Sequence, residues 1–319
     1  MLHFEIKGGI RMVILLLFLH AYQPQLLAQD VIFTQWENMP IYFNPSLTGN
    51  FKGNIRLRTK YRDQWRSLLG KNAFNTSAAS FEYKFNEGSK RKLSLGMHAL
   101  LDNAGQSLST NSYNLSTSIS QNLGDTKDAH HNISLGFNLG VVTKKLDLEW
   151  SPGTEPEDFK SKISYPDFSS GINWQYISQN RFQFQLGSGI AHLNKPNVSF
   201  FETGTVRPDL RYTIHGVAEV PIMAKISLAP SFLYFKQGFF DQLLFGLAGK
   251  FYFKANEFDF LQLGLLAKTT QNFDGRDVNV FVLSTMVELN GILLGYSFDR
   301  FQSTESNAHE FSLGYVFGR

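Results

Sequence analysis

The sequence predicts an all-β protein, a transmembrane outer-membrane β-barrel of about 14 antiparallel strands. Three observations support this prediction: period-two alternation after residue 50, connections that alternate between long and short, and an export leader. In 131–143, for example, Ile133, Leu135 and Phe137 alternate with Ser134 and Gly136. Successive side chains of a strand point to opposite faces, so one face is apolar and the other is small and polar.

The first 28 residues predict a cleavable signal peptide. Lys7 and Arg11 precede the apolar run 12–19, and Ala28 offers a small residue for cleavage before Gln29. The apolar run is shorter than the ~20 residues that a membrane-spanning helix needs. The sequence therefore predicts export, with a retained N-terminal anchor as the alternative.

Composition narrows the class of protein further. The chain has 319 residues, including 30 Phe, 12 Tyr and 26 Gly, and it has no cysteine. Disulfides and thiolate metal sites are therefore excluded. A net charge of +3, without a run of five like charges, gives no indication of nucleic-acid binding.

Strands are expected throughout residues 51–319, which we assign to the barrel, and most are long enough to cross a membrane at a tilt. The expected ranges are 53–65, 73–85, 91–101, 111–122, 131–143, 168–178, 181–193, 210–220, 224–236, 241–253, 257–269, 277–288, 291–298 and 309–317.

The connections between these strands alternate in length. Connections after odd-numbered strands, such as 102–110, 144–167 and 194–209, are mostly longer than those after even-numbered strands, such as 179–180 and 289–290. Short periplasmic turns and longer outer loops are typical of outer-membrane barrels. A soluble β-sandwich, which would also explain the alternating faces, has no reason to keep this pattern.

Residues 29–50 do not read as strand and are expected to form a plug or a periplasmic arm. Phe33, Trp36 and Phe43 suit packing against the inner wall of 257–288, where the expected strands are partly apolar on both faces. Asn44-Pro45 is expected to set a bend that leads into the barrel.

The first expected strand carries a row of basic residues at period two, here called the basic stripe. Such a row is costly in contact with lipid, so it is expected to line the lumen. It either holds an acidic plug or partner, or pairs with carboxylates of the lumen. The stripe is Arg56, Arg58, Lys60 and Arg62, and the carboxylates considered are Glu82, Glu219 and Glu288.

The sequence offers no catalytic or cofactor-binding motif. The eight histidines have no metal-ligand spacing, and no phosphate-binding or nucleophile-elbow pattern is present. We therefore expect a protein that is not an enzyme and that uses no cofactor or metal.

Short motifs along the whole mature chain resemble the PorP/SprF family. They begin with Gln29-Asp30, Phe33-Thr34-Gln35, Phe43-Asn44-Pro45 and 61–65 (YRDQW). They continue with 165–168 (YPDF) and 192–196 (HLNKP), and close with 295–299 (GYSFD) and 313–315 (LGY). The resemblance implies an outer-membrane component of the type IX secretion system of gliding and secreting Bacteroidetes. It also implies partners: secretion-machinery subunits, including periplasmic ring or lipoprotein components, a secreted cargo or surface adhesin, and membrane lipid.

On this interpretation, outer loops bind cargo and the periplasmic side binds the machinery. A transport channel for small or hydrophobic solutes, like the fatty-acid transporters, is the alternative. The residues that we expect to contact partners are Phe33, Gln35, Trp36, Phe43, Asn44, Pro45, Tyr165, Pro166, Asp167, Lys195 and Pro196.

Overall fold

The computed structural model describes residues 30–85, 90–126, 129–148, 156–253, 259–271, 277–302 and 306–318. The leader predicted at 1–28 lies outside the described residues. Among the described residues, no helix is long and apolar enough to cross a membrane.

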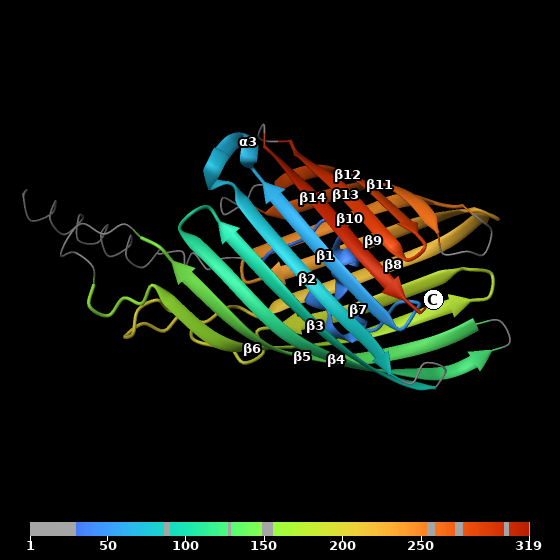
Figure 1. Cartoon of the computed structure of the whole chain (residues 1–319), viewed down its shortest axis with the longest axis horizontal. Coiled ribbons are helices and arrows are strands. Elements are labelled where there is room, and N and C mark those ends of the chain that lie inside the picture. The colour runs from blue at the N-terminus through green and yellow to red at the C-terminus, as the bar shows by residue number, and fades with distance from the viewer. Residues whose placement is uncertain are drawn as a thin grey trace, which may run out of the picture. The chain divides into compact units, whose positions relative to one another are not determined.

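The described residues form one closed β-barrel of fourteen strands (Figure 1). Each strand pairs with its neighbours in the sequence, and β1 pairs with β14 in antiparallel register to close the sheet. The predicted barrel and strand number are confirmed, and a β-sandwich is excluded because closure leaves no edge strands.

The strand bounds are β1 Ile55–Gln64, β2 Phe74–Phe85, β3 Arg91–Ala104, β4 Leu108–Thr126, β5 Ala129–Leu146, β6 Lys162–Ser178 and β7 Gln183–Ala191. They continue with β8 Arg211–Met223, β9 Ile226–Gln237, β10 Phe240–Tyr252, β11 Phe260–Gln271, β12 Asp277–Leu289, β13 Ile292–Phe301 and β14 Asn307–Phe317.

The two faces of the barrel differ as the alternation predicts. Leu115 and Phe137 point outward and are 55% and 48% exposed, whereas their inward neighbours Ser116 and Asn138 are 0% and 5% exposed. An apolar outer face and a polar inner face suit a barrel that is surrounded by lipid.

The barrel has two distinct ends. We call the end at Ile55 and Phe317 the terminal end, and the opposite end, where β1 reaches Gln64, the loop end. Long connections such as 192–210 lie at the loop end, whereas 224–225 and 290–291 are tight turns at the terminal end. The alternation therefore holds, although the loop end also has the short turns 105–107 and 238–239. The β1–β2 connection at the loop end contains α3 (Arg66–Leu69) and η3 (Gly70–Asn72).

The predicted bounds of two loops were wrong, because the structure makes both loops shorter. The loop expected at 102–110 is the turn 105–107, because β3 and β4 continue further toward the loop end. The loop expected at 144–167 is shorter at both ends, since β5 ends at Leu146 and β6 begins at Lys162. Tyr165, Pro166 and Asp167 are therefore strand residues.

Pro166 is tolerated within β6 because that part of the strand has a neighbour on one side. β7 pairs with β6 only from Ser170 onward, whereas β5 pairs with β6 along the whole strand. The carbonyl of Pro166 accepts a hydrogen bond from Asn194 Nδ2 (2.8 Å), which lies on the side away from β5. The N–H that proline lacks would point to the same side, so the hydrogen bonds between β5 and β6 are unaffected.

The N-terminal segment lies inside the barrel and is seen behind the front strands in Figure 1. It contains η1 (Trp36–Asn38), α2 (Pro40–Phe43) and η2 (Pro45–Leu47). Its apolar side chains join inward residues of the wall in the largest buried apolar cluster of the described chain. The barrel is thus packed around its own N-terminus.

Candidate functional site

The candidate site is the interface between the barrel wall and residues 31–50, which we call the plug. Phe33, Trp36 and Met39 are at most 2% exposed and pack in one cluster with Leu233 of β9 and Leu244 of β10. Leu266 of β11 joins this cluster, so the wall predicted at 257–288 contributes to it. The apolar contact surface nevertheless extends well beyond that predicted wall.

The short helices of the plug follow from local capping. Pro40 and Pro45 occupy first helical positions, where the missing N–H has no cost. The Asn44 side chain accepts hydrogen bonds from Ser46 N (2.9 Å) and Ser46 Oγ (2.6 Å) at the start of η2. Asn44 thus lies between α2 and η2, and these two bonds fix the start of η2.

Glycines of the barrel wall let the plug backbone approach the strands. A methyl group on Gly136 of β5 would lie 2.1 Å from Ser46 N and 2.2 Å from the Pro45 carbonyl carbon. One on Gly189 of β7 would lie 2.4 Å from the Phe43 carbonyl oxygen. A side chain at either position would displace the plug, so close contact between plug and wall requires glycine at Gly136 and Gly189.

Buried ion pairs lie beside the start of the plug. Lys60 Nζ is 2.9 Å from Glu310 Oε2, and Arg62 Nη1 is 2.6 Å from Glu310 Oε1. Asp299 pairs with Arg62 Nη2 at 3.1 Å and with Lys268 Nζ at 2.8 Å. All five side chains are at most 5% exposed. Buried charges need this pairing because each alone would carry a large desolvation cost.

The same charged groups hold the plug backbone. Glu310 accepts hydrogen bonds from Thr34 N (2.6 Å) and Gln35 N (3.1 Å). Lys60 Nζ donates to the Gln35 carbonyl oxygen at 2.6 Å. Charge-assisted hydrogen bonds of this kind are stronger than neutral ones. The network therefore fixes the plug and closes β14 onto β1 at the same point.

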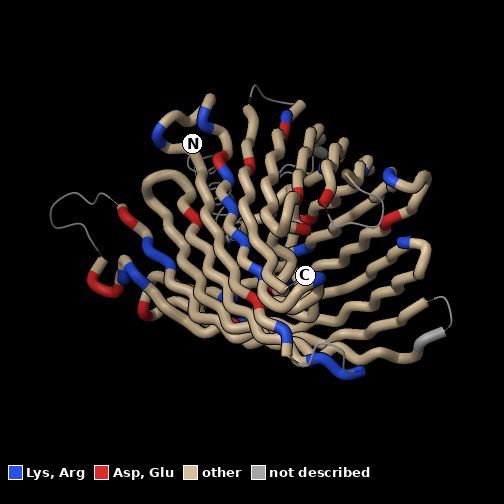
Figure 2. The backbone as a smooth tube through the Cα atoms, turned by 45° about the vertical axis from the view of Figure 1, so that its right-hand side comes forward, with Lys and Arg blue, Asp and Glu red and all other residues tan. Residues whose placement is uncertain are grey.

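The basic stripe lines the lumen, as predicted (Figure 2 shows its alternation along β1). Arg56 makes two hydrogen bonds to the Glu82 carboxylate, at 2.7 and 2.9 Å, so pairing with Glu82 is confirmed. Glu219 pairs instead with Lys250 of β10. Lys60 pairs with Glu310, and Arg62 pairs with both Asp299 and Glu310. Both basic side chains also donate hydrogen bonds to the plug, Lys60 to the Gln35 carbonyl oxygen and Arg62 to Thr34 Oγ1.

Three residues of this network were missed at the sequence level: Lys268, Asp299 and Glu310. Asp299 and Glu310 are charged residues on the small, polar face of their strands, whereas Lys268 lies on a face of β11 that also carries Phe260 and Leu266. An inward position signals a lumen charge, but Asp299 and Glu310 pair with β1, which is far away in the sequence. Arg62, for example, is 237 residues from Asp299 and 248 from Glu310.

Glu37 of η1 is the carboxylate that the plug brings into the lumen. Glu37 is half-buried inside the barrel. Desolvation by the surrounding protein raises the pKa of its carboxyl above the usual value. Lys250 and a hydrogen bond with Ser231 lower that pKa in part. The folded protein therefore holds a proton on Glu37 to higher pH than the unfolded chain does.

This raised pKa predicts a pH dependence. Between the unfolded and folded pKa values of Glu37 the folded state binds more protons, so the free energy of unfolding falls as pH rises through that interval. Glu37→Gln is expected to remove this slope and to raise stability at neutral pH. Unfolding measured as a function of pH tests it, with the exposed Glu202→Gln as the control. A wild-type slope in Glu37→Gln would contradict the assignment.

The predicted residues at the loop end form a separate group. Asp167 of β6 points inward and its Oδ1 lies 2.9 Å from His192 Nδ1. Val198 packs on Val142 and Tyr165, so the connection 192–210 covers part of the inner wall there. Lys195 and Pro166 are exposed, whereas Pro196 is buried.

The structure thus divides the predicted partner-binding residues into two sets. The plug residues Phe33, Gln35, Trp36, Phe43 and Asn44 are at most 5% exposed, and Pro45 is also buried. They contact the barrel wall and offer no surface to a partner. The exposed residues of the loop end remain available for binding.

Residues 26–315 match the family described as type IX secretion system membrane protein PorP/SprF. A barrel closed around its own N-terminal segment defines the class as an outer-membrane-type β-barrel protein. The match covers most of the chain, and the chain belongs to the PorP/SprF family of the type IX secretion system. No curated protein matches the chain.

Solved barrels resemble the structure with low sequence identity. The CymD monoaromatic hydrocarbon channel matches with a TM-score of 0.52 and 9% identity, covering 92% of this chain and 95% of that one. A Pseudomonas aeruginosa FadL homologue matches with a TM-score of 0.49 and 12% identity, covering 86% and 93%. CdiB from Acinetobacter baumannii matches with a TM-score of 0.46 and 8% identity, covering 82% of this chain, which spans 60% of CdiB. The CymD match shows a shared fold alone.

Proposed function

We propose that this protein is a non-enzymatic outer-membrane component of the type IX secretion system that binds secreted cargo or adhesins at the cell surface. The loop end faces the outside and carries the cargo-binding surface. The terminal end faces the periplasm and contacts machinery subunits. Export through a cleavable signal peptide over residues 1–28 is part of this proposal.

The observation that carries the proposal is the filled lumen. Plug residues bond to the wall on β2, β4, β6, β8 and the strands from β11 to β14. A solute pathway through the part of the lumen that the plug occupies would have to displace buried apolar residues and charge-assisted hydrogen bonds. A binding platform needs no such pathway, so the filled lumen favours a platform over a transport channel.

The orientation predicts a labelling pattern for single cysteines, which the cysteine-free chain allows. Leu68→Cys, exposed at the loop end, is expected to react with a membrane-impermeant maleimide in intact cells. Lys52→Cys at the terminal end is expected to react only after the outer membrane is permeabilised. Leu47→Cys, enclosed in the plug, is expected to react in neither case. Reaction of Leu47→Cys after permeabilisation would identify a periplasmic arm instead.

Cargo binding is tested at the exposed side chains of the loop end. Alanine at Lys195, Phe201 and Arg207 together is expected to weaken cargo retention at least about tenfold, because a few exposed anchors carry most binding energy at protein interfaces. The measurement is the amount of secreted protein on the cell surface and in the medium of the native host. Alanine at Leu135 and Leu139, exposed on the outer face of β5 and away from both ends of the barrel, is the control.

Binding to the secretion machinery is tested separately. Crosslinking and purification from outer membranes should recover secretion-machinery subunits at the terminal end. Normal secretion and normal surface retention in a deletion strain, together with reduced solute uptake, would reject the proposal in favour of the transport channel.

A further inference from the structure

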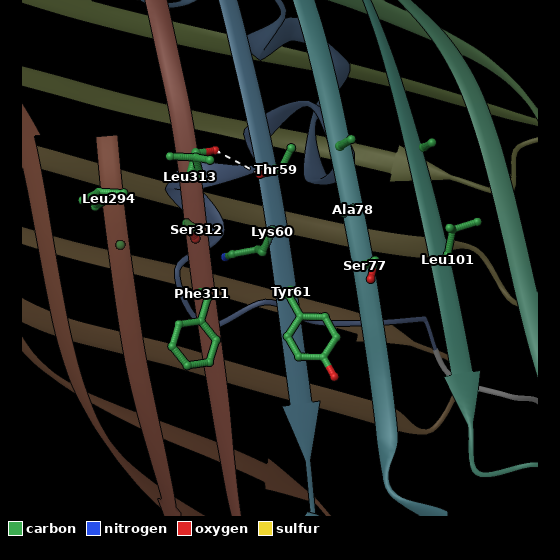
Figure 3. A pocket seen from close by; sticks show the side chains of 13 residues that line it. Thr59, Lys60, Tyr61, Ser77, Ala78, Leu101, Leu294, Phe311, Ser312 and Leu313 are labelled. Carbon is green, nitrogen blue, oxygen red and sulfur yellow. Dashed lines mark hydrogen bonds between the residues drawn. The ribbon is translucent and has the colours of Figure 1, made fainter. Parts of the chain in front are cut away.

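The outward face of the barrel carries a groove of about 650 Å³ where β14 closes onto β1 (Figure 3). Its floor is formed by the small side chains of Thr59, Ser77, Ala79 and Ala99. Tyr61 and Phe311 stand at one end of this floor, as Figure 3 shows. The groove thus lies on the surface that contacts lipid hydrocarbon.

The strand register explains the hollow. Thr59 pairs with Ala79, and Ala79 pairs with Ala99, so three small side chains lie side by side across β1, β2 and β3. Thr59 and Tyr61 pair with Leu313 and Phe311 on the other side. Small residues next to large ones leave a depression that a bulkier occupant can fill.

The groove lies in the half of the membrane nearest the loop end. Two residues beyond Tyr61 and Ser77, Asp63 pairs with Asn75, and Asn103 Nδ2 donates to Asn75 Oδ1 at 3.1 Å. This polar row marks the edge of the apolar band. Two residues of a strand span about 7 Å, so the groove lies directly below the headgroup region.

Basic side chains lie next to the groove on its loop-end side, at the same edge of the apolar band. Arg300 of β13 pairs with Asn307 of β14, and Asn307 accepts a hydrogen bond from Trp65 N at 2.9 Å. Arg66 follows Trp65, and Lys71 lies in the same connection. Arg66, Lys71 and Arg300 are all exposed. Among the described residues near them, Asp63 carries a negative charge, and its Oδ2 lies 2.5 Å from Arg66 Nε. The rim is therefore positive.

We propose that the groove and its basic rim bind a phosphorylated glycolipid of the outer leaflet, of the lipid A type. An acyl chain fills the floor at Thr59, Ala79 and Ala99, and the phosphates lie against Arg66, Lys71 and Arg300. A membrane-spanning helix would also suit a floor of small residues. Only an anionic headgroup uses the cations directly above the floor, which favours the lipid.

The experiment is native mass spectrometry of the full-length protein extracted from outer membranes in mild detergent and then supplied with lipid A. A matched sample receives enzymatically dephosphorylated lipid A. Ala79→Phe fills the groove and is expected to abolish retention of both lipids. Leu135→Phe, an outward change on β5, is the control. Lys71→Gln with Arg300→Gln is expected to lower retention of lipid A by about fivefold for each charge, and to leave the dephosphorylated lipid unchanged.

Heat-modifiable gel mobility confirms that each variant is folded. If Ala79→Phe retains as much lipid A as the wild type, the proposal is wrong. It is also wrong if the wild-type protein co-purifies with a polypeptide that is absent from Ala79→Phe. Loss of lipid A and its dephosphorylated form to the same degree in the glutamine variant overturns the role of the phosphates. Cargo retention is not a readout here, so failure of this proposal and failure of the secretion function remain distinguishable.

Discussion

Replacing Gly136 by alanine is expected to lower the free energy of unfolding by about 3 kcal/mol, the upper end of the range for overpacking. The new methyl group would lie 2.1 Å from Ser46 N, and the atoms that it meets are backbone atoms of the plug. Those atoms are held on both sides, by the Asn44 cap and by the hydrogen bond from Ser118 Oγ to the Thr48 carbonyl oxygen (2.6 Å). The plug must therefore shift as a unit. Urea unfolding in lipid vesicles measures the change.

Gly264→Ala is the matched control for this prediction. Gly264 is also buried in a strand of the wall, but a methyl group there would meet its nearest neighbour, Ala248 Cβ, at an ordinary 3.4 Å. Its expected effect is less than about 1 kcal/mol, or a slight stabilisation. Equal effects of the two substitutions would show that wall glycines act through strand propensity and not through contact with the plug.

The barrel could be predicted from the sequence because its signal is local. A period of two, short turns and tilted strand lengths each involve neighbouring residues, and together they set the strand number. The limits of the strands were less certain where polar residues continue the pattern beyond the membrane. Pro166 illustrates this, because proline normally ends a strand but here lies on an unpaired side of β6.

The plug interface could be predicted only in part, for a physical reason. The apolar residues Phe33, Trp36 and Phe43 signal burial wherever they lie, so a plug could be proposed. Their wall was identified only in part: Leu266 lies in the wall predicted at 257–288, but Leu233 of β9 and Leu244 of β10 also contact the plug, and no local pattern sets these inward apolar residues apart as plug contacts. The fit at Gly136 depends on three-dimensional proximity to Ser46, 90 positions earlier, which no local pattern encodes.

The filled lumen gives this membrane protein an interior core like that of a soluble protein. Lipid cannot drive the burial of inward side chains, so the plug supplies their partners from within the same chain. The same contacts bring β1, β13 and β14 together, since Lys60, Asp299 and Glu310 all meet at Thr34 and Gln35. The plug thus stabilises the closure of the barrel as well as filling it.

Glu310→Gln is therefore expected to have the largest effect among single charge changes, about 3–5 kcal/mol, the range for breaking a buried ion pair. The substitution leaves Lys60 and Arg62 buried with less negative charge, and it replaces one acceptor oxygen used by Thr34 N or Gln35 N with a donor. Loss of the plug contact should expose residues 31–50 to protease in the purified protein. Unfolding and protease cleavage are measured on the same sample.

Two further variants separate the buried charge from a general effect of substitution. Arg66→Gln breaks an ion pair with Asp63 in which the Arg66 side chain is exposed, and it is expected to leave stability close to that of the wild type because solvent screens such pairs. Adding Lys60→Met to Glu310→Gln removes the unpaired ammonium, so the double variant should recover part of the lost stability. A double variant whose loss equals the sum of the two single losses would show that Lys60 and Glu310 act independently, and that the network is not what holds the plug.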